Sequence, residues 1–157
     1  EAVGTAKHVA DLFAGCGTFA LPLARSAEVH AVESVAEMLV ALDAGWRTAR
    51  GLKKVTTEKR DLFRRPMVPL ELRHFDAVVL DPPRAGAEAQ IEQIVDSIVA
   101  RVAMVSCNPV TFARDAEQLV SAGFIIDWID VVDQFRWSGH VELVAQFTKP
   151  HMSKKSR

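Results

Sequence analysis

The sequence predicts an α/β fold built on a doubly wound, seven-stranded, mostly parallel sheet whose last strand is antiparallel. Strand and helix patterns alternate along most of the chain, an order typical of a parallel sheet covered by helices. The last two strand patterns follow each other without a helix between them, which predicts an antiparallel hairpin. The chain has 157 residues, of which 49% are hydrophobic, so we expect one domain with a substantial core.

Seven segments have the composition of strands. We expect them over residues 8–12, 28–33, 54–58, 75–80, 102–106, 124–132 and 141–147. The second segment alternates apolar and polar residues at period two. The fourth and fifth are apolar runs that stop at Asp81-Pro82-Pro83 and at Asn108-Pro109, because proline cannot donate a hydrogen bond to a neighbouring strand.

Four segments between these strands are expected to be helical. A short helix over residues 19–26 follows a glycine-containing turn, and longer helices cover residues 87–99 and the segment from Phe112 to Gly123. The fourth helix is expected to begin with a capping box, in which Ser34 is the N-cap and Glu37 lies at the third helical position. Its apolar face is formed by Val35, Met38, Leu39, Leu42 and Trp46.

Composition excludes several classes of protein. No apolar run approaches the ~20 residues that cross a bilayer, so no membrane partner is expected. The two cysteines, Cys16 and Cys107, form no CxxC pair, which excludes a disulfide scaffold and a cysteine-rich zinc site; we expect no bound metal and a reducing, cytoplasmic location. The chain starts at Glu1 without a signal-peptide pattern, and we expect it to be a piece of a longer protein. Residues 149–157 are expected to be a disordered basic tail.

The charge is distributed unevenly along the chain. Nine basic and three acidic residues lie between Arg47 and Arg73, whereas the remainder has ten basic and seventeen acidic residues. A basic stretch within an otherwise acidic domain is typical of a protein that binds a polyanion. A solvated helix face and loop would give the same composition, so charge alone does not establish a partner.

Ligands of doubly wound sheets bind outside the carboxyl ends of the strands, and the first such end is followed by a glycine-rich turn. Gly15 and Gly17 allow a sharp turn and close approach of the backbone to a ligand, and Glu33 lies where a ribose hydroxyl acceptor is expected. A dinucleotide pyrophosphate would be repelled by the carboxylates of Asp11 and Asp81. The sulfonium and ammonium groups of S-adenosylmethionine would be stabilised by them, so we favour that cofactor over NAD.

Two further strand ends have residues suited to chemistry. The rigid segment from Asp81 to Gly86 offers a carboxylate and carbonyls that suit the N–H edge of a planar heterocycle, although it is equally a simple strand stop. Cys107 lies at the mouth of an apolar strand and is a candidate nucleophile, although free cysteines are more often packing residues. Cys16 is explained as a small residue in the glycine turn. Glu142 cannot be assigned a role from spacing.

Four motifs together resemble those of the RNA uracil-C5 methyltransferases, which form 5-methyluridine in tRNA or rRNA. They are Asp-Leu-Phe-Ala-Gly-Cys-Gly-Thr-Phe-Ala-Leu-Pro-Leu-Ala over residues 11–24, Asp-Pro-Pro-Arg-Ala-Gly over 81–86, Ser-Cys-Asn-Pro-Val-Thr over 106–111 with Ala-Arg-Asp over 113–115, and His-Val-Glu over 140–142. The first is shared by many methyltransferases, whereas the second and third in this order are highly specific. The resemblance implies a Rossmann-like class I methyltransferase domain over residues 1–148.

The resemblance also implies roles for individual residues. Phe13, Thr18, Glu33, Asp61 and Asp81 are implied to lie around S-adenosylmethionine, together with Asp11, Gly15 and Gly17 of the first turn. Cys107 is implied to be the nucleophile that attacks carbon 6 of uracil, and Glu142 the base that removes the proton from carbon 5. We expect Asp81, Arg84 and His140 to contact the base.

Family members carry an upstream RNA-binding portion, sometimes with an iron–sulfur cluster, that has no counterpart in this chain. The basic stretch from Arg47 to Arg73 is then a candidate track for RNA phosphates. We expect Trp137 to bury the carboxylate of Glu142 and thereby raise its pKa. Two other functions remain open from the sequence: an NAD-dependent oxidoreductase and a non-catalytic nucleic-acid-binding module.

Overall fold

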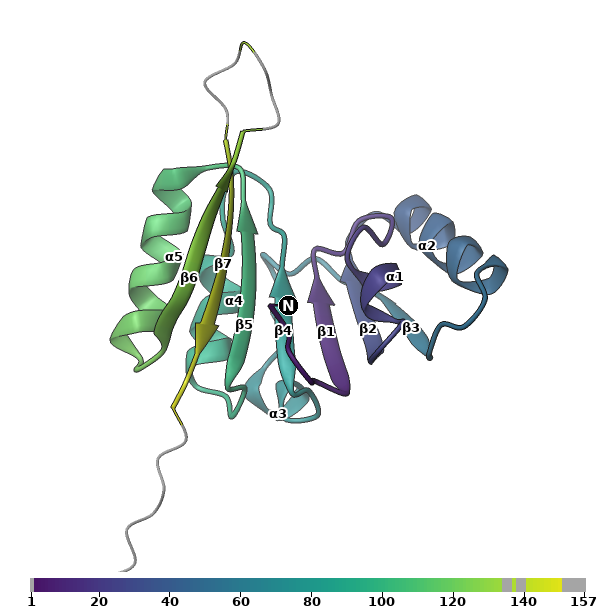
Figure 1. Ribbon diagram of the computed structural model, residues 1–157, viewed down its shortest axis with the longest axis horizontal. Coiled ribbons are helices and arrows are strands. Elements are labelled where there is room, and N and C mark those ends of the chain that lie inside the picture. Colours follow the sequence, from purple (N-terminus) through teal and green to yellow (C-terminus); the bar gives the residue numbers. More distant parts are fainter. Residues whose placement is uncertain (1, 134–136, 138–140, 151–157) are drawn as a thin grey trace, which may run out of the picture.

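The computed structural model describes residues 2–133, 137 and 141–150, and they form a seven-stranded sheet with helices on both faces (Figure 1). The strands are β1 (His8–Leu12), β2 (Glu28–Glu33), β3 (Val55–Lys59), β4 (Ala77–Leu80), β5 (Arg101–Ser106), β6 (Ile125–Val132) and β7 (Glu142–Thr148). The helices are α1 (Ala20–Leu23), α2 (Ala36–Thr48), α3 (Pro69–Leu72), α4 (Glu88–Val95) and α5 (Pro109–Ser121).

The sheet has the strand order β3-β2-β1-β4-β5-β7-β6. The neighbouring strands from β3 to β5 are parallel, and β7 is antiparallel to both of its neighbours. The predicted doubly wound sheet with an antiparallel last strand is therefore confirmed. Because β1 and β4 are adjacent although β2 and β3 lie between them in sequence, the chain reverses direction across the sheet at this point, where ligands of such folds bind.

Apolar side chains fill the space between the sheet and the helices on each face. One core lies beneath α4 and α5 and includes Ile91, Ile94, Phe112, Leu119 and Phe147, all buried. The other lies beneath α1 and α2 and includes Ala20, Ala24, Leu42 and Val55. The small residues of α1 allow that short helix to lie close against the sheet. Packing in both cores fixes the positions of the strand ends.

The N-terminus of α2 differs from the expected capping box. The N-cap is Val35, and the Ser34 side chain makes no capping hydrogen bond. Instead, the Glu33 carboxylate accepts hydrogen bonds from the N–H groups of Ser34 at 2.7 Å and Val35 at 2.9 Å. The Ser34 hydroxyl also donates to Glu33, at 3.0 Å, so this serine supports the strand end that precedes the helix.

Helix ends are the other departures from the sequence-based expectations. Helix α4 stops at Val95, earlier than expected, because the Ser97 hydroxyl donates to the Ile94 carbonyl at 2.7 Å and accepts from the Val99 N–H at 3.2 Å. Helix α1 is limited to four residues. Helix α3 was not expected; Pro69 begins it, and the Glu71 carboxylate accepts the Val68 N–H at 3.0 Å.

The described residues include no helix that is both long and apolar enough to cross a bilayer. The start of the expected tail is corrected, because the Lys149 N–H donates to the Ala100 carbonyl at 2.8 Å and its ammonium lies 5.2 Å from the Phe124 ring centre. Residues 151–157, the remainder of that expected tail, lie outside the described part of the chain.

Gly17 provides a test of how closely α1 and α2 pack. Its φ is +96°, and a Cβ atom there would lie 2.9 Å from Leu42 Cγ and 3.2 Å from Leu21 Cγ. Gly51 has a φ of +75° but no atom within 4 Å of a Cβ. We expect Gly17→Ala to lower the free energy of unfolding by about 2–4 kcal/mol and Gly51→Ala by about 1 kcal/mol. Urea denaturation of both variants measures the difference, and equal losses would contradict the packing argument.

Candidate active site

A cavity of about 380 Å³ opens at the carboxyl ends of the parallel strands. Its walls combine apolar side chains with three carboxylates. The lining residues are Phe13, Glu33, Ser34, Val35, Met38, Arg60, Asp61, Leu62, Phe63, Asp81, Pro82 and Pro83. This composition suits a ligand that has both a flat apolar part and groups that bond to carboxylates.

The Glu33 carboxylate joins the two turns that border this cavity. Its Oε1 accepts the hydrogen bonds from Ser34 and Val35, and its Oε2 accepts one from the Gly15 N–H at 3.0 Å. Burial raises the pKa of Glu33, but the N–H groups of Val35 and Gly15 and the two donors of Ser34 outweigh it and leave the pKa below its ordinary value. Glu33 is therefore ionised, and its Oε2, which accepts one hydrogen bond, retains the capacity to accept another from a ligand in the cavity.

Phe13 and Phe63 form an aromatic wall of the cavity. Their ring centres lie 5.4 Å apart with the planes inclined by 54°. Phe13 has a φ of +63°, an uncommon conformation for a residue other than glycine, at the point where the chain leaves β1. The strained backbone turns this ring toward the cavity, a placement typical of functional sites.

Two aspartates beside the cavity lie in surroundings that disfavour their charged forms. Asp11 is completely buried, and neither carboxylate oxygen has a hydrogen-bond partner among the described residues. Burial, followed by the nearby charge of Asp81, raises the pKa of Asp11 to about 7. Burial, followed by the charge of Glu142, raises the pKa of Asp81 to about 6. Positive charge at this site would relieve the repulsion among these carboxylates.

The pairing of β5 with β7 brings Cys107 and Glu142 to the same end of the sheet. In this antiparallel ladder the last pair is Ser106 with Leu143; Cys107 directly follows Ser106, and Glu142, the first residue of β7, directly precedes Leu143. Cys107 is half-buried rather than sealed in the core. The charge of Glu142 is near enough to Asp81 to raise the pKa of that aspartate. A thiol and two carboxylates therefore lie at the same strand ends.

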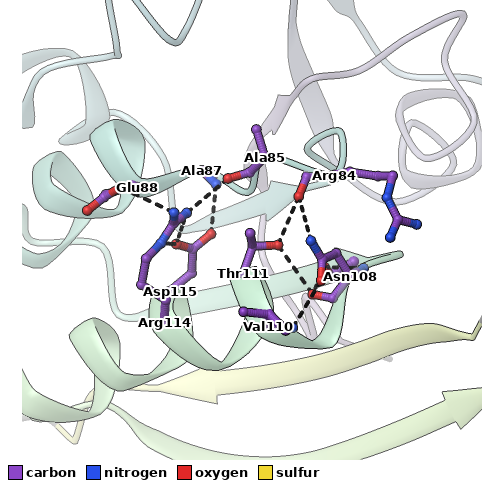
Figure 2. Close-up of polar contacts among 10 residues, drawn as sticks. Arg84, Ala85, Ala87, Glu88, Asn108, Val110, Thr111, Arg114 and Asp115 are labelled. Carbon is purple, nitrogen blue, oxygen red and sulfur yellow. Dashed lines mark hydrogen bonds and ion pairs between the residues drawn. The ribbon is translucent and has the colours of Figure 1, made fainter.

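The segment after Cys107 is fixed to the segment that begins at Asp81 (Figure 2). Asn108 is the N-cap of α5: its side-chain oxygen accepts the Val110 N–H at 3.1 Å, and its amide donates to the Arg84 carbonyl at 2.9 Å. The Thr111 hydroxyl donates to the same carbonyl at 3.2 Å. Arg84 in turn donates to the Cys107 carbonyl at 3.4 Å.

A second set of contacts, one turn further along α5, strengthens this attachment. The buried Asp115 carboxylate accepts the Ala87 N–H at 2.7 Å and two hydrogen bonds from Arg114, at 2.7 and 2.9 Å. Arg114 also donates to the Ala85 carbonyl at 3.1 Å and pairs with Glu88 at 3.2 Å. Figure 2 shows these side chains directed from α5 toward residues 84–88.

Gly86 shows how closely α5 packs against residues 84–88. Its φ is +78°, and a Cβ atom there would lie 2.5 Å from an Arg114 nitrogen and 2.7 Å from an Asp115 oxygen. Any other residue type would be strained at this φ and would require the Arg114, Asp115 and Thr111 side chains to shift. The segment that carries Asp81 and the helix that follows Cys107 thus form one rigid unit.

The structure brings together some of the residues predicted from the sequence. Phe13, Glu33, Asp61 and Asp81 line the cavity; Arg84, Cys107 and Glu142 do not line it, but Arg84 bonds to the Cys107 carbonyl and the charge of Glu142 acts on Asp81. Asp11, Gly15, Gly17 and Thr18 do not line it, although Gly15 supports Glu33; their predicted contacts with a cofactor stay predictions. His140, predicted to contact the substrate, lies outside the described residues.

Other features were not predicted. The apolar wall formed by Val35, Met38, Leu62 and Phe63 was missed as part of the site, although each residue closely follows a strand, which was the available signal. The expectation that Trp137 buries Glu142 is wrong, because Trp137 is fully exposed. The attachment of Asp115 to Ala87 was not predicted, because it joins residues 28 positions apart, one in the middle of α5 and the other at the start of α4.

Comparisons with known proteins agree with this geometry. The family model for tRNA (uracil-5-)-methyltransferases matches residues 2–149. An uncharacterised RNA methyltransferase of Rhizobium meliloti is 59% identical over 147 residues, which cover 94% of this chain and 35% of that protein. The chain thus spans about a third of that relative's length. The 23S rRNA (uracil(1939)-C(5))-methyltransferase of Photobacterium angustum is 38% identical and is covered over 68% of its length, by 95% of this chain.

The fold is also similar to a solved structure. The Pyrococcus abyssi tRNA (uracil-54, C5)-methyltransferase, in complex with S-adenosyl-L-homocysteine, superposes with a TM-score of 0.79 at 30% identity. The match covers 90% of this chain and 34% of that one.

The buried Asp11 predicts an unusual pH dependence of stability. Its pKa of about 7 exceeds the ordinary 3.8, so the folded protein binds a proton that the unfolded chain releases between these values. Stability from this group is complete below pH 4 and is lost as the pH rises through 7. We expect Asp11→Asn to gain unfolding free energy over wild type across this range, by up to about 4 kcal/mol. Denaturant titrations from pH 4 to 8 measure the difference, and a difference independent of pH would contradict the assignment.

Proposed function

The chain belongs to the tRNA (uracil-5-)-methyltransferase family, and we propose that it catalyses transfer of the methyl group of S-adenosylmethionine to carbon 5 of a uridine in rRNA or tRNA. The observation that supports this proposal is the antiparallel pairing of β5 with β7, which brings the end of β5, followed by Cys107, to the start of β7 at Glu142, whose charge acts on the cavity residue Asp81. A nucleophile and a base side by side are what carbon-5 substitution of a pyrimidine requires.

The cavity fits S-adenosylmethionine in charge and in shape. The lone pair on Glu33 Oε2 suits a ribose hydroxyl, and the wall containing Phe13, Val35 and Phe63 suits an adenine ring. Burial and the charges of neighbouring carboxylates raise the pKa values of Asp11 and Asp81, and a sulfonium or ammonium group would lower both. The same carboxylates would repel a pyrophosphate, which argues against an NAD-dependent oxidoreductase. When bound, S-adenosylmethionine supplies an electrophilic methyl group.

Cys107 is proposed to start the reaction. Carbon 5 of uracil is a weak nucleophile, so the Cys107 thiolate adds to carbon 6, and the electron pair of the 5,6 double bond moves toward carbon 5 and the 4-carbonyl oxygen. A sulfur–carbon bond forms, and carbon 5 becomes nucleophilic enough to accept the methyl group. Asp81 and Arg84, held by α5, border the position of the base and orient its polar edge.

Glu142 is proposed to complete the reaction. Its carboxylate removes the proton from the methylated carbon 5, the electron pair left behind re-forms the 5,6 double bond, and Cys107 leaves as a thiolate. The products are 5-methyluridine, S-adenosylhomocysteine and a protonated Glu142. Because Cys107 directly follows β5 and Glu142 begins β7 at the same end of the ladder, both are proposed to reach the same base without a change in the fold.

A covalent adduct with 5-fluorouridine RNA tests the nucleophile. Fluorine cannot leave as a proton, so we expect the wild-type protein, with all flanking sequence that its gene encodes, to form a denaturation-resistant adduct in the presence of S-adenosylmethionine. Cys107→Ser should abolish the adduct. Cys16→Ser removes the other cysteine, which is exposed in the glycine turn, and should leave adduct formation unchanged. Gel electrophoresis under denaturing conditions gives the readout; an adduct that survives in Cys107→Ser would refute the assignment.

The role of Glu142 is tested with unmodified RNA. Glu142→Gln should still add and methylate but release product at least 100-fold more slowly, because general-base catalysis typically contributes about 10²–10⁴-fold. We therefore expect the adduct to accumulate on ordinary uridine, as measured by rapid quench. Glu117→Gln, an exposed position on α5, is the matched control. Normal turnover by Glu142→Gln would show that another group takes the proton.

A further inference from the structure

We infer that the outer edge of the sheet, formed by β3 with the chain segments on either side of it, binds the phosphate backbone of the RNA substrate. This inference rests on the proposed function, since it names the surface by which the same RNA is held. The cations between Arg47 and Arg73 fall into two groups: some hold the fold together, and the others face solvent.

Some cations of this stretch are used within the protein. Arg60 is half-buried and bonds to Glu58 at 2.6 Å and to Glu71 at 2.6 and 2.9 Å. This guanidinium lowers the pKa of Glu71 to about 2, so the pair is a structural connection between β3 and α3. Arg47 pairs with Asp43 at 2.7 Å, and Arg64 pairs with Asp61 at 3.5 Å.

The other cations of the stretch are exposed and, among the described residues, have no carboxylate in ion-pair distance. They are Arg50, Lys53, Lys54, Lys59, Arg65 and Arg73. The three acids between Arg47 and Arg73 are already paired with Arg60 or Arg64. The positive charge of this surface is therefore not cancelled locally.

These cations follow a path that leads to the active-site cavity. Strand β3 is at the outer edge of the sheet (Figure 1), with Lys53 and Lys54 before its first residue and Lys59 at its last. Lys59 lies opposite Glu33 in the β2–β3 pairing, and the next residues, Arg60 and Asp61, line the cavity. At about 3.3 Å per residue, Lys54 and Lys59 are about 17 Å apart, enough for several consecutive phosphates of a single strand.

Lysines on an edge strand have a second possible explanation. They prevent exposed strands from pairing with other chains, which would also account for Lys54 and Lys59. The two explanations lead to different consequences. Loss of a phosphate-binding surface weakens RNA binding and reduces its dependence on salt, whereas loss of edge protection makes the protein self-associate. The accumulation of unpaired cations beyond the strand, at Arg50, Lys53 and Arg65, favours the first.

The test removes two cations at the end of the surface that is far from the cavity. Lys53→Gln/Lys54→Gln lowers the net charge by two units without touching the cavity lining. The control, Ile98→Glu/Val120→Glu, changes the net charge equally at two exposed positions on the far side of the sheet, after α4 and in α5. Both are compared with wild type for binding a labelled 20-nucleotide uridine-rich single-stranded RNA, by fluorescence anisotropy in 50–400 mM KCl.

We expect the lysine variant to bind roughly tenfold more weakly in 0.1 M KCl, and its slope of log affinity against log salt to be smaller by about 1.4, since each phosphate contact with single strands contributes about 0.7. The control should keep the wild-type slope. An unchanged slope in the lysine variant overturns the inference, and so does self-association by light scattering with unchanged RNA affinity.

Failure of this inference is distinguishable from failure of the proposed function. Cys107→Ser should bind the same RNA with the wild-type slope while forming no 5-fluorouridine adduct. A lysine variant with normal binding and a normal adduct would remove the surface and leave the chemistry intact. A wild-type protein that binds through the lysines but never forms the adduct would support the surface and contradict the reaction.

Discussion

Six residue pairs join β5 to β7, from Arg101 with Thr148 to Ser106 with Leu143, and both the core and the proposed chemistry depend on this antiparallel ladder. Ala145 and Phe147 enter the core beneath α4 and α5 through it. The same register fixes which side chains meet at the open end of the strands. A slip by one residue would turn Phe147 out of the core and separate Glu142 from Cys107, so the burial of apolar surface enforces the geometry of the site.

The site gathers negative charge where the fold gains no stability from it. Asp81 repels both Asp11 and Glu142, and neither side-chain oxygen of Asp11 has a hydrogen-bond partner among the described residues. Groups retained under such conditions are typical of functional sites, because a ligand of opposite charge relieves the strain when it binds. Glu33 is the contrasting case: four donors stabilise its charge and hold it still before any ligand arrives.

The sheet was predicted almost entirely from the sequence, because period-two alternation and proline stops are local signals, as at β2 and at the end of β4. The helix ends were not predicted, because side chains form hydrogen bonds with backbone groups there. Ser97 ends α4, and Glu33 replaces the expected cap at Ser34. Motifs identified Cys107 and Glu142, but their proximity depends on β7 returning beside β5. The exposure of Trp137 could not be predicted either, because an aromatic residue in the sequence gives no signal of whether other side chains cover it.

Gly86 leaves no space between its backbone and the side chains of α5, which makes the rim around the base position stiff. Such a rim does not close over its target as a lid would. In the proposed reaction it is therefore the RNA that changes conformation: its uridine must unstack and rotate outward. Uridines in loops or beside weak base pairs, where RNA distorts easily, would then be preferred because they cost less energy to unstack. No residue would need to recognise the neighbouring nucleotides.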